Sequence, residues 1–210
     1  MKELATLLIL LGATICAWTV DAWLEQVNAV THDPDQVKQA HKGWDETDIQ
    51  PTIQPKTTTS TKNTKDTPRF FETGEQVGKL EIPRIGNSYD VFWGTDRDTL
   101  KKGVGMYDSK YTVVPGQAGH VLLAGHRDTV FRKLKQVKKG DHLYVEFNDK
   151  TYDYQVRDIW ITDRDDRSVI VKKQTPTLTL STCYPFDYLG DAPKRYIIQS
   201  KLVSVEENNK

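Results

Sequence analysis

Residues 177–205 read TLTLSTCYPFDYLGDAPKRYIIQSKLVSV, which is two runs of strand-forming residues joined by a loop with two prolines. The runs TLTLST (177–182) and RYIIQSKLVSV (195–205) are rich in β-branched and large apolar residues, which favour β-strands. Pro185 ends the first strand because proline has no N–H to donate to a strand ladder. If the loop folds as a hairpin, the second strand returns beside the first.

Five earlier stretches have the same strand-like composition. They are VGKLEIPRI (77–85), YDVFWG (89–94), HVLLAG (120–125), HLYVEFND (142–149) and TYDYQVRDIWI (151–161). Two interruptions, at 99–104 and 130–137, have a helical pattern. Many short strands with little helix predict a mostly β fold, a closed or nearly closed barrel of seven or eight strands with two short helices.

The amino terminus carries an apolar run, Leu4–Val20, with no charged residue in 17 positions. This length is at the short end of what a helix needs to cross a hydrocarbon layer about 30 Å thick. Trp18 and Trp23 fall at its carboxyl end, where amphipathic aromatic side chains prefer the headgroup level. One lysine precedes the run and no basic residue follows it before Lys38, so positive-inside bias places the amino terminus in the cytoplasm. Residues 1–24 are therefore predicted to be a cytoplasmic stub and a single-pass transmembrane anchor, with the rest of the chain outside.

The alternative for this run is a cleaved signal peptide. Its charged region would consist of one lysine beside Glu3, and Ala13, Ala17 and Ala22 form no A-x-A cleavage site. The sequence therefore favours a retained anchor, and Cys16 is expected to be a membrane-buried thiol.

Between the anchor and the predicted barrel lies a polar stretch, residues 25–71, expected to be a juxtamembrane segment followed by a linker. Its first half has the apolar spacing of a short helix, broken near Asp33-Pro34. Residues 51–68 contain seven threonines and three prolines in 18 positions, too little apolar surface to offset the entropy of folding, which predicts an extended linker. The folded domain is expected at 72–206, an ordinary single-domain length, followed by a polar tail at 207–210.

Whole-chain composition excludes some functions. The 210 residues carry 29 basic and 29 acidic side chains, whereas a nucleic-acid-binding protein has a large basic excess. Two cysteines exclude a disulfide scaffold. No nucleic-acid partner is expected.

Cys183 follows a predicted strand, and such a position makes a thiol both rigid and accessible. A thiol is mostly protonated at neutral pH, so a nucleophilic cysteine needs a base or a positive neighbour. His126 also lies just past a strand end, after small residues that leave room for a substrate, whereas His120 and His142 begin strands and have ordinary surface interpretations. Arg195 starts the strand after the cysteine loop and would return beside Cys183, where a guanidinium stabilises an oxyanion. The adjacent Lys194 is the alternative for that role, and a buried structural thiol is the alternative for Cys183.

Three motifs resemble those of sortases, the cysteine transpeptidases of Gram-positive surfaces. TLSTC (179–183) resembles the TLxTC signature, LAGHRDTVF (123–131) resembles the catalytic-histidine segment, and KRYII (194–198) resembles the catalytic-arginine strand. The resemblance covers about 77–203, is greatest to class D sortases, and implies that the barrel is of the sortase type. One departure is His120, where many relatives carry Asn or another small polar residue.

The resemblance implies an activity. Cys183 would be the nucleophile, His126 the general acid and base, and Arg195 the clamp for the oxyanion and the substrate backbone. The enzyme would cleave secreted proteins after the Thr of a C-terminal LPxT-type sorting signal, with class D relatives favouring LPNT. The thioester would pass to an amine of a peptidoglycan stem or cross-bridge, or to a pilin lysine.

The loop 162–176 is expected to form a wall of the substrate groove. The predicted substrate contacts are Thr182, Val169, Ile170 and Val171. No cofactor is expected, and Asp163, Asp165 and Asp166 resemble calcium ligands, which some sortases use, although a solvated acidic loop paired with its arginines is the preferred interpretation.

Three alternatives differ from a sortase. A cysteine protease would hydrolyse its substrate without an amine acceptor, and an L,D-transpeptidase-like enzyme would carry an SHGC-type segment in place of the Leu-Ser-Thr before Cys183. A membrane-tethered binding module would have an inert, structural Cys183.

Overall fold

The structure is a computed structural model that describes residues 2–28, 30–54, 71–188 and 190–208. Its centre is a closed β-barrel, as predicted, in which the strands follow the order β3-β2-β6-β7-β9-β8-β5-β4 and β4 pairs again with β3. The strands are β2 (Gln76–Ile82), β3 (Asn87–Trp93), β4 (Val104–Met106), β5 (His120–Ala124), β6 (His142–Phe147), β7 (Lys150–Asp163), β8 (Thr177–Tyr184) and β9 (Lys194–Glu207).

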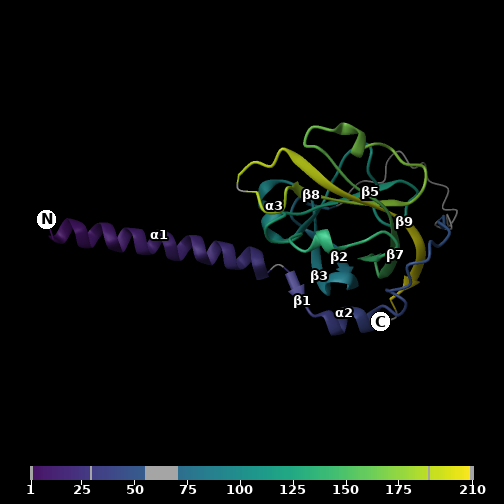
Figure 1. The fold of residues 1–210 in the computed structure, drawn as a ribbon, viewed down its shortest axis with the longest axis horizontal. Coiled ribbons are helices and arrows are strands. Elements are labelled where there is room, and N and C mark those ends of the chain that lie inside the picture. Colours follow the sequence, from purple (N-terminus) through teal and green to yellow (C-terminus); the bar gives the residue numbers. More distant parts are fainter. Residues whose placement is uncertain (1, 29, 55–70, 189, 209–210) are drawn as a thin grey trace.

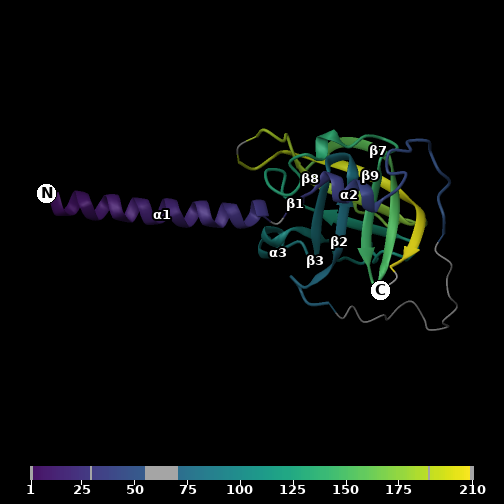
Figure 2. The same cartoon turned by 90° about the horizontal axis from the view of Figure 1, so that it is seen from below.

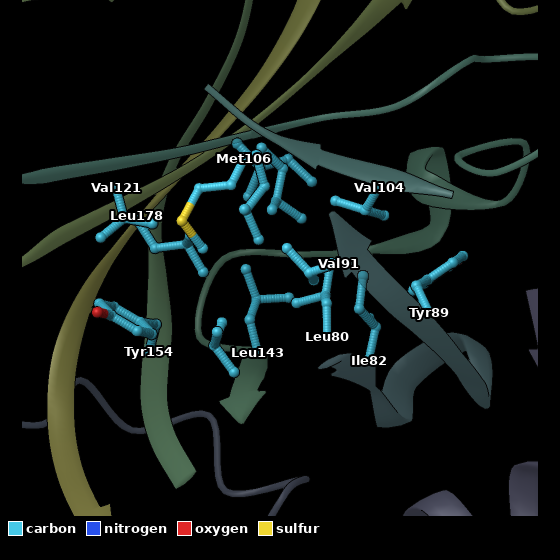
Figure 3. Close-up of a cluster of buried hydrophobic side chains, with 14 of the residues drawn as sticks. Leu80, Ile82, Tyr89, Val91, Val104, Met106, Val121, Leu143, Tyr154 and Leu178 are labelled. Carbon is cyan, nitrogen blue, oxygen red and sulfur yellow. The ribbon is translucent and has the colours of Figure 1, made fainter. Parts of the chain in front are cut away.

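Apolar side chains from all sides of the barrel fill its interior (Figure 3). They come from alternate positions of the strands, as the period of two in a strand requires when one face is buried. The fully buried members include Leu80, Val91, Leu143, Leu178 and Tyr154. This core makes the strand ends rigid, and the site described below is built on those ends.

The seven predicted strands are all present, and β4 is an additional strand that was not predicted. Its first residue, Val104, was expected to end a helix at 99–104; instead α3 (Arg97–Lys102) begins after the Asp96 cap and ends at Lys102, with Gly103 as its C-cap. A three-residue strand is too short to show periodicity, and here its pairing partners on β3 and β5 decide its conformation. The first predicted strand also ends early, because Pro83–Ile85 forms the 3-10 helix η1.

The helix expected at 130–137 is wrong. That stretch consists of turns followed by the short 3-10 helix η2 (Leu134–Gln136). Val130, Phe131, Leu134 and Val137 are all buried in the main core, so their helix-like spacing results from successive turns that point apolar side chains inward.

The N-terminal helix α1 (Lys2–Asn28) projects away from the barrel (Figure 1). Its window Glu3–Val20 has the length and composition to cross a membrane, and none of that window is buried in the protein. Among the described residues it is the one helix with these properties, and it contains the predicted anchor run.

Residues 30–54, here called the N-terminal strap, lie against the barrel rather than apart from it. Strand β1 (Val30–His32) pairs with residues 87–89 of β3, which leaves residues 91–93 of β3 to pair with β4. The helix α2 (Pro34–Ala40) follows, begins at the Asp33 cap and buries Val37. Figure 2 shows α2 against the barrel near β2 and β3.

The second half of the strap is attached by side chains of the barrel. His41 bonds Glu81 at 2.5 Å and stacks on the ring of Tyr144, with ring centroids 3.6 Å apart. His142 approaches the carbonyl oxygen of Glu46 at 3.0 Å, and the strap ends with the N–H of Ile53 donating to Leu202.

The strap lies within the stretch expected to be a juxtamembrane segment, and it contacts the barrel. Barrel contacts extend from Val30 to Ile53, upstream of the expected domain start at residue 72. Most of the threonine-rich stretch, residues 55–70, lies outside the described residues. In the chain this stretch connects two segments that both contact the barrel. The connection from α1 to the barrel is therefore the single residue between Asn28 and Val30.

Candidate active site

Cys183 and Arg195 are direct partners across the antiparallel pair of β8 and β9. Opposed residues of such a pair have Cβ atoms about 4.5–5.5 Å apart, so the thiol and the guanidinium start from neighbouring points of one sheet. Both side chains are half-buried. The hairpin expected from the sequence therefore brings these two residues together, with residues 185–193 as its loop.

His126 reaches the same edge of the sheet from β5. This strand runs parallel to β8, with Ala124 beside Ser181. The N–H of Gly125 donates to the Ser181 carbonyl at 3.2 Å, and the hydroxyl of Thr182 donates to the Gly125 carbonyl at 2.7 Å. These two bonds fix the backbone immediately before His126 against the residues immediately before Cys183. The imidazole and the thiol thus belong to neighbouring strand ends.

Gly125 has a steric reason to be glycine. A Cβ at this position would lie 2.9 Å from the ring of Phe131, closer than real side chains allow. Phe131 is fully buried, and its N–H donates to the His126 carbonyl at 2.7 Å. The turn that carries His126 is therefore packed tightly onto the core.

Arg127 connects the histidine segment to the cysteine loop. Its guanidinium donates to the carbonyl oxygens of Tyr188 and Gly190, the second at 2.8 Å, and lies 5.8 Å from the centre of the Tyr188 ring. The two loops that border Cys183 are thereby joined by one side chain. Sequence reasoning missed Arg127, since only the fold brings it to partners that are 61 and 63 residues away.

The guanidinium of Arg195 lies over its own loop, with Nη1 donating to the carbonyls of Lys194 at 3.1 Å and Ala192 at 3.4 Å. Lys194, the alternative cation, is exposed and sits opposite Tyr184 rather than Cys183. The register therefore favours Arg195 as the cation beside the thiol.

The β7–β8 loop (residues 164–176) was expected to contact substrate, and its three apolar residues differ in exposure. Val169 is buried in the 3-10 helix η3 (Arg167–Val169) and packs with Leu122 and Ile197 on a second, smaller core. Ile170 is partly buried against the same cluster, and Val171 is 38% exposed. The partly exposed members of this cluster near β5 are Tyr107, Ala124, Trp160 and Ile170.

The other two barrel histidines do not have the surface positions expected for them. His120 is fully buried between Val171 and Thr179, and burial lowers its pKa, with only partial opposition from the Val171 carbonyl. His142 is buried as well, beside Asp153. Burial opposes its charge, but the hydrogen bond and the charge of Asp153 outweigh it and raise the pKa of His142.

The three aspartates considered for calcium do not converge. Asp166 caps η3, accepting from the Ser168 N–H and from the hydroxyl of Thr162, and these hydrogen bonds lower its pKa. Asp163 ends β7 opposite Lys194. Within the described residues, no three His, Cys, Asp or Glu side chains form a group that would hold a metal ion. The calcium alternative gains no support from this arrangement.

The sortase domain family matches residues 80–203, well over half of the chain. The chain belongs to the sortase family. It is 43% identical over 150 residues to sortase D of Bacillus subtilis (strain 168), covering 70% of this chain and 75% of that protein.

Solved sortase structures match as well. The catalytic domain of B. anthracis SrtD aligns with a TM-score of 0.58 at 49% identity, covering 70% of this chain and 99% of that chain. The sortase D5 transpeptidase of Clostridium perfringens aligns with a TM-score of 0.57 at 25% identity, covering 64% of this chain and 82% of that chain. The resemblance to class D sortases and the barrel are therefore confirmed, and this sortase is a cysteine transpeptidase.

Proposed function

We propose that this sortase cleaves an LPxT-type sorting signal, of the LPNT kind, after its threonine and transfers the acyl group to an amine. The observation that carries the proposal is the convergence of Cys183, His126 and Arg195 on one edge of the barrel. Cys183 lies on β8, Arg195 lies on β9 and His126 follows the end of β5, and the core packs behind these strands.

The proposed first step forms a thioester. The sulfur of Cys183 attacks the threonine carbonyl carbon, the thiol proton passes to His126, and the guanidinium of Arg195 stabilises the oxyanion. His126 then gives that proton to the departing amine as the C–N bond breaks.

In the second step the acceptor amine attacks the thioester, His126 takes its proton, and a new amide forms as the Cys183 thiol is released. The proposed acceptors are an amine of a peptidoglycan stem or cross-bridge, or a pilin lysine. The proposed donors are secreted proteins with C-terminal sorting signals.

The substrate is proposed to lie along the partly exposed apolar residues beside the β7–β8 loop. Ile170 and Val171 are the accessible members of the predicted contacts, while Val169 supports them from the small core. Thr182 is buried and bonded to Gly125, so its contribution is to hold the strand ends rather than to touch the signal through its hydroxyl.

We also propose that α1 anchors the sortase in the cell membrane, with the amino terminus in the cytoplasm and the barrel outside. The exposed apolar window Glu3–Val20 supports this proposal, because an apolar surface without protein contacts is suited to lipid. The absence of a basic residue between Lys2 and Lys38 supports the orientation.

The test is mass spectrometry of products after the full-length sortase meets an LPNT peptide and a set of candidate amines. We expect a product cut after threonine and joined to one amine, and none with Cys183→Ala. Cys16→Ala is the matched control, since Cys16 lies on α1, and it should retain full ligation. Hydrolysis alone with every amine would indicate a protease instead, and full ligation by Cys183→Ala would refute the assignment.

A further inference from the structure

We propose that His120 is a positioning residue that holds the β7–β8 loop in the conformation that binds the sorting signal. The proposal rests on the proposed function of this loop as a substrate contact. His120 is the first residue of β5, at the opposite end of that strand from His126, so it has no place in the chemical steps described above.

The contacts of His120 join the loop to the barrel. Its Nδ1 lies 3.0 Å from the carbonyl oxygen of Val171, and its Nε2 lies 2.8 Å from the hydroxyl of Thr179 on β8. A carbonyl oxygen only accepts, so Nδ1 carries the proton and Nε2 of the neutral ring accepts from the Thr179 hydroxyl. The ring is fully buried, and burial lowers its pKa, which keeps the imidazole in this neutral form.

The bond from His120 reaches the β7–β8 loop at Val171, between the two points where the ends of the loop are attached. The loop is attached at its start, where the N–H of Arg164 donates to Pro193, and at its end, where Lys201 donates to Thr175. Between these points Val169 packs into the small core, and the residues after Ile170 form no helix or strand. The bond from His120 holds the backbone at this irregular stretch, next to the residues proposed to contact the signal.

Loss of the bond should therefore weaken substrate binding rather than the chemistry. If the loop is free to move, the Ile170 and Val171 side chains must become ordered when the signal binds. The conformational entropy lost in that ordering makes the binding free energy less favourable. Cys183, His126 and Arg195 keep their own backbone bonds, which do not involve this loop segment.

The experiment compares His120→Leu, His120→Asn and His142→Asn in the full-length sortase. His142 is the matched control because it is equally buried and also begins a strand, but it holds the N-terminal strap instead of the β7–β8 loop. Asn at 120 keeps an N–H near the position of Nδ1 and serves as the conservative variant.

With the LPNT peptide we expect His120→Leu to raise KM about tenfold, the effect of losing one hydrogen bond, while kcat stays within about twofold. His120→Asn should recover most of the wild-type KM, and His142→Asn should leave KM unchanged even if it lowers the melting temperature. An equal KM rise in His142→Asn, or a loss of kcat at constant KM in His120→Leu, would overturn the proposal.

A second readout does not depend on the substrate. Amide hydrogen exchange should be faster across 169–174 in His120→Leu than in wild type, with exchange at 120–126 unchanged. If no LPNT peptide reacts with the wild type, the proposed function fails, and exchange at 169–174 still decides whether His120 holds the loop. If His120→Leu does not fold, His120→Ala takes its place in both measurements: raised KM and faster exchange at 169–174 support the proposal, whereas wild-type values, or an equal KM rise in His142→Asn, contradict it.

Discussion

Cys183 and Arg195 are separated by twelve residues in the chain, yet they face each other as a directly paired position of β8 and β9. The pairing places the backbones of the thiol-bearing and guanidinium-bearing residues at adjacent positions of the sheet. The neighbouring pair is Tyr184 with Lys194, so a shift by one residue would exchange the arginine for a lysine. The register of this hairpin thus selects the cation at the site.

Arg195→Ala is expected to lower kcat/KM for LPNT ligation by about 10²–10³-fold, the usual cost of removing an oxyanion donor. Arg195→Lys should recover only part of it, because an ammonium keeps the charge but not the planar pair of donors. Lys194→Ala is the matched control and should stay within a few-fold of wild type. Steady-state kinetics of the three variants measures these effects. An equal loss in Lys194→Ala would mean that Arg195 is not the specific oxyanion donor and that Lys194 shares this function.

Gly125→Ala is expected to destabilise the sortase by about 1–3 kcal/mol, because the added methyl group overlaps the buried ring of Phe131. Ligation should fall further than the fraction unfolded explains, since the displaced backbone carries His126. Urea unfolding and kcat/KM measure the two effects. Adding Phe131→Leu should recover part of the loss, and strictly additive effects of the two substitutions would show that the overlap is not the cause.

The contacts of the N-terminal strap predict that the barrel stays bound to the strap and α1 after the chain between the strap and the barrel is cut. A protease site inserted after Lys62 should allow the chain to be cut while the barrel remains in the membrane fraction, held by residues 30–54. Val37→Asp, which places a charge in the buried side of α2, should release it after the same cut. Sedimentation of membranes followed by immunoblotting gives the result. Release of the cut protein without Val37→Asp would mean that the strap contacts are too weak to hold the barrel.

The raised pKa of His142 predicts that the free energy of unfolding depends on pH. Burial opposes its charge, but Asp153 raises its pKa above the ordinary value, so the folded state binds the proton more tightly than the unfolded state. The resulting stabilisation is complete below the unfolded pKa of about 6.5 and is lost as pH rises through the folded pKa. The difference in unfolding free energy between wild type and His142→Asn should therefore be larger near pH 6 than near pH 8.5, as measured by urea denaturation. His120 has the opposite shift, but it is present in both proteins and cancels. A difference that grows with pH would contradict the assignment.

Much of the barrel follows from local sequence. Strand-forming runs such as 142–149 and 151–161 hold their pattern without help from distant residues, and the turn between them is local as well. The hairpin of β8 and β9 is also formed by one continuous stretch of chain. The proximity of Cys183 and Arg195 could therefore be predicted from that stretch alone. The three sortase-like motifs then pointed to His126 as the third group.

Other features depend on contacts between distant segments and had no local signal. Strand β4 exists because β3 and β5 pair with it on either side. His120 and His142 look like ordinary polar strand starts, but their partners lie 51 and 96 residues away, at Val171 and Glu46. The burial and the tautomer of each histidine depend on those distant partners.

The sequence alone determined the apolar helix, the strand-rich barrel and the motif residues, because each depends on composition or periodicity within a short window. Only the tertiary structure decided that residues 30–54 belong to the barrel and that a buried histidine holds the β7–β8 loop. A polar segment is stable there because barrel side chains satisfy its hydrogen bonds, and no property of the segment itself reveals those partners.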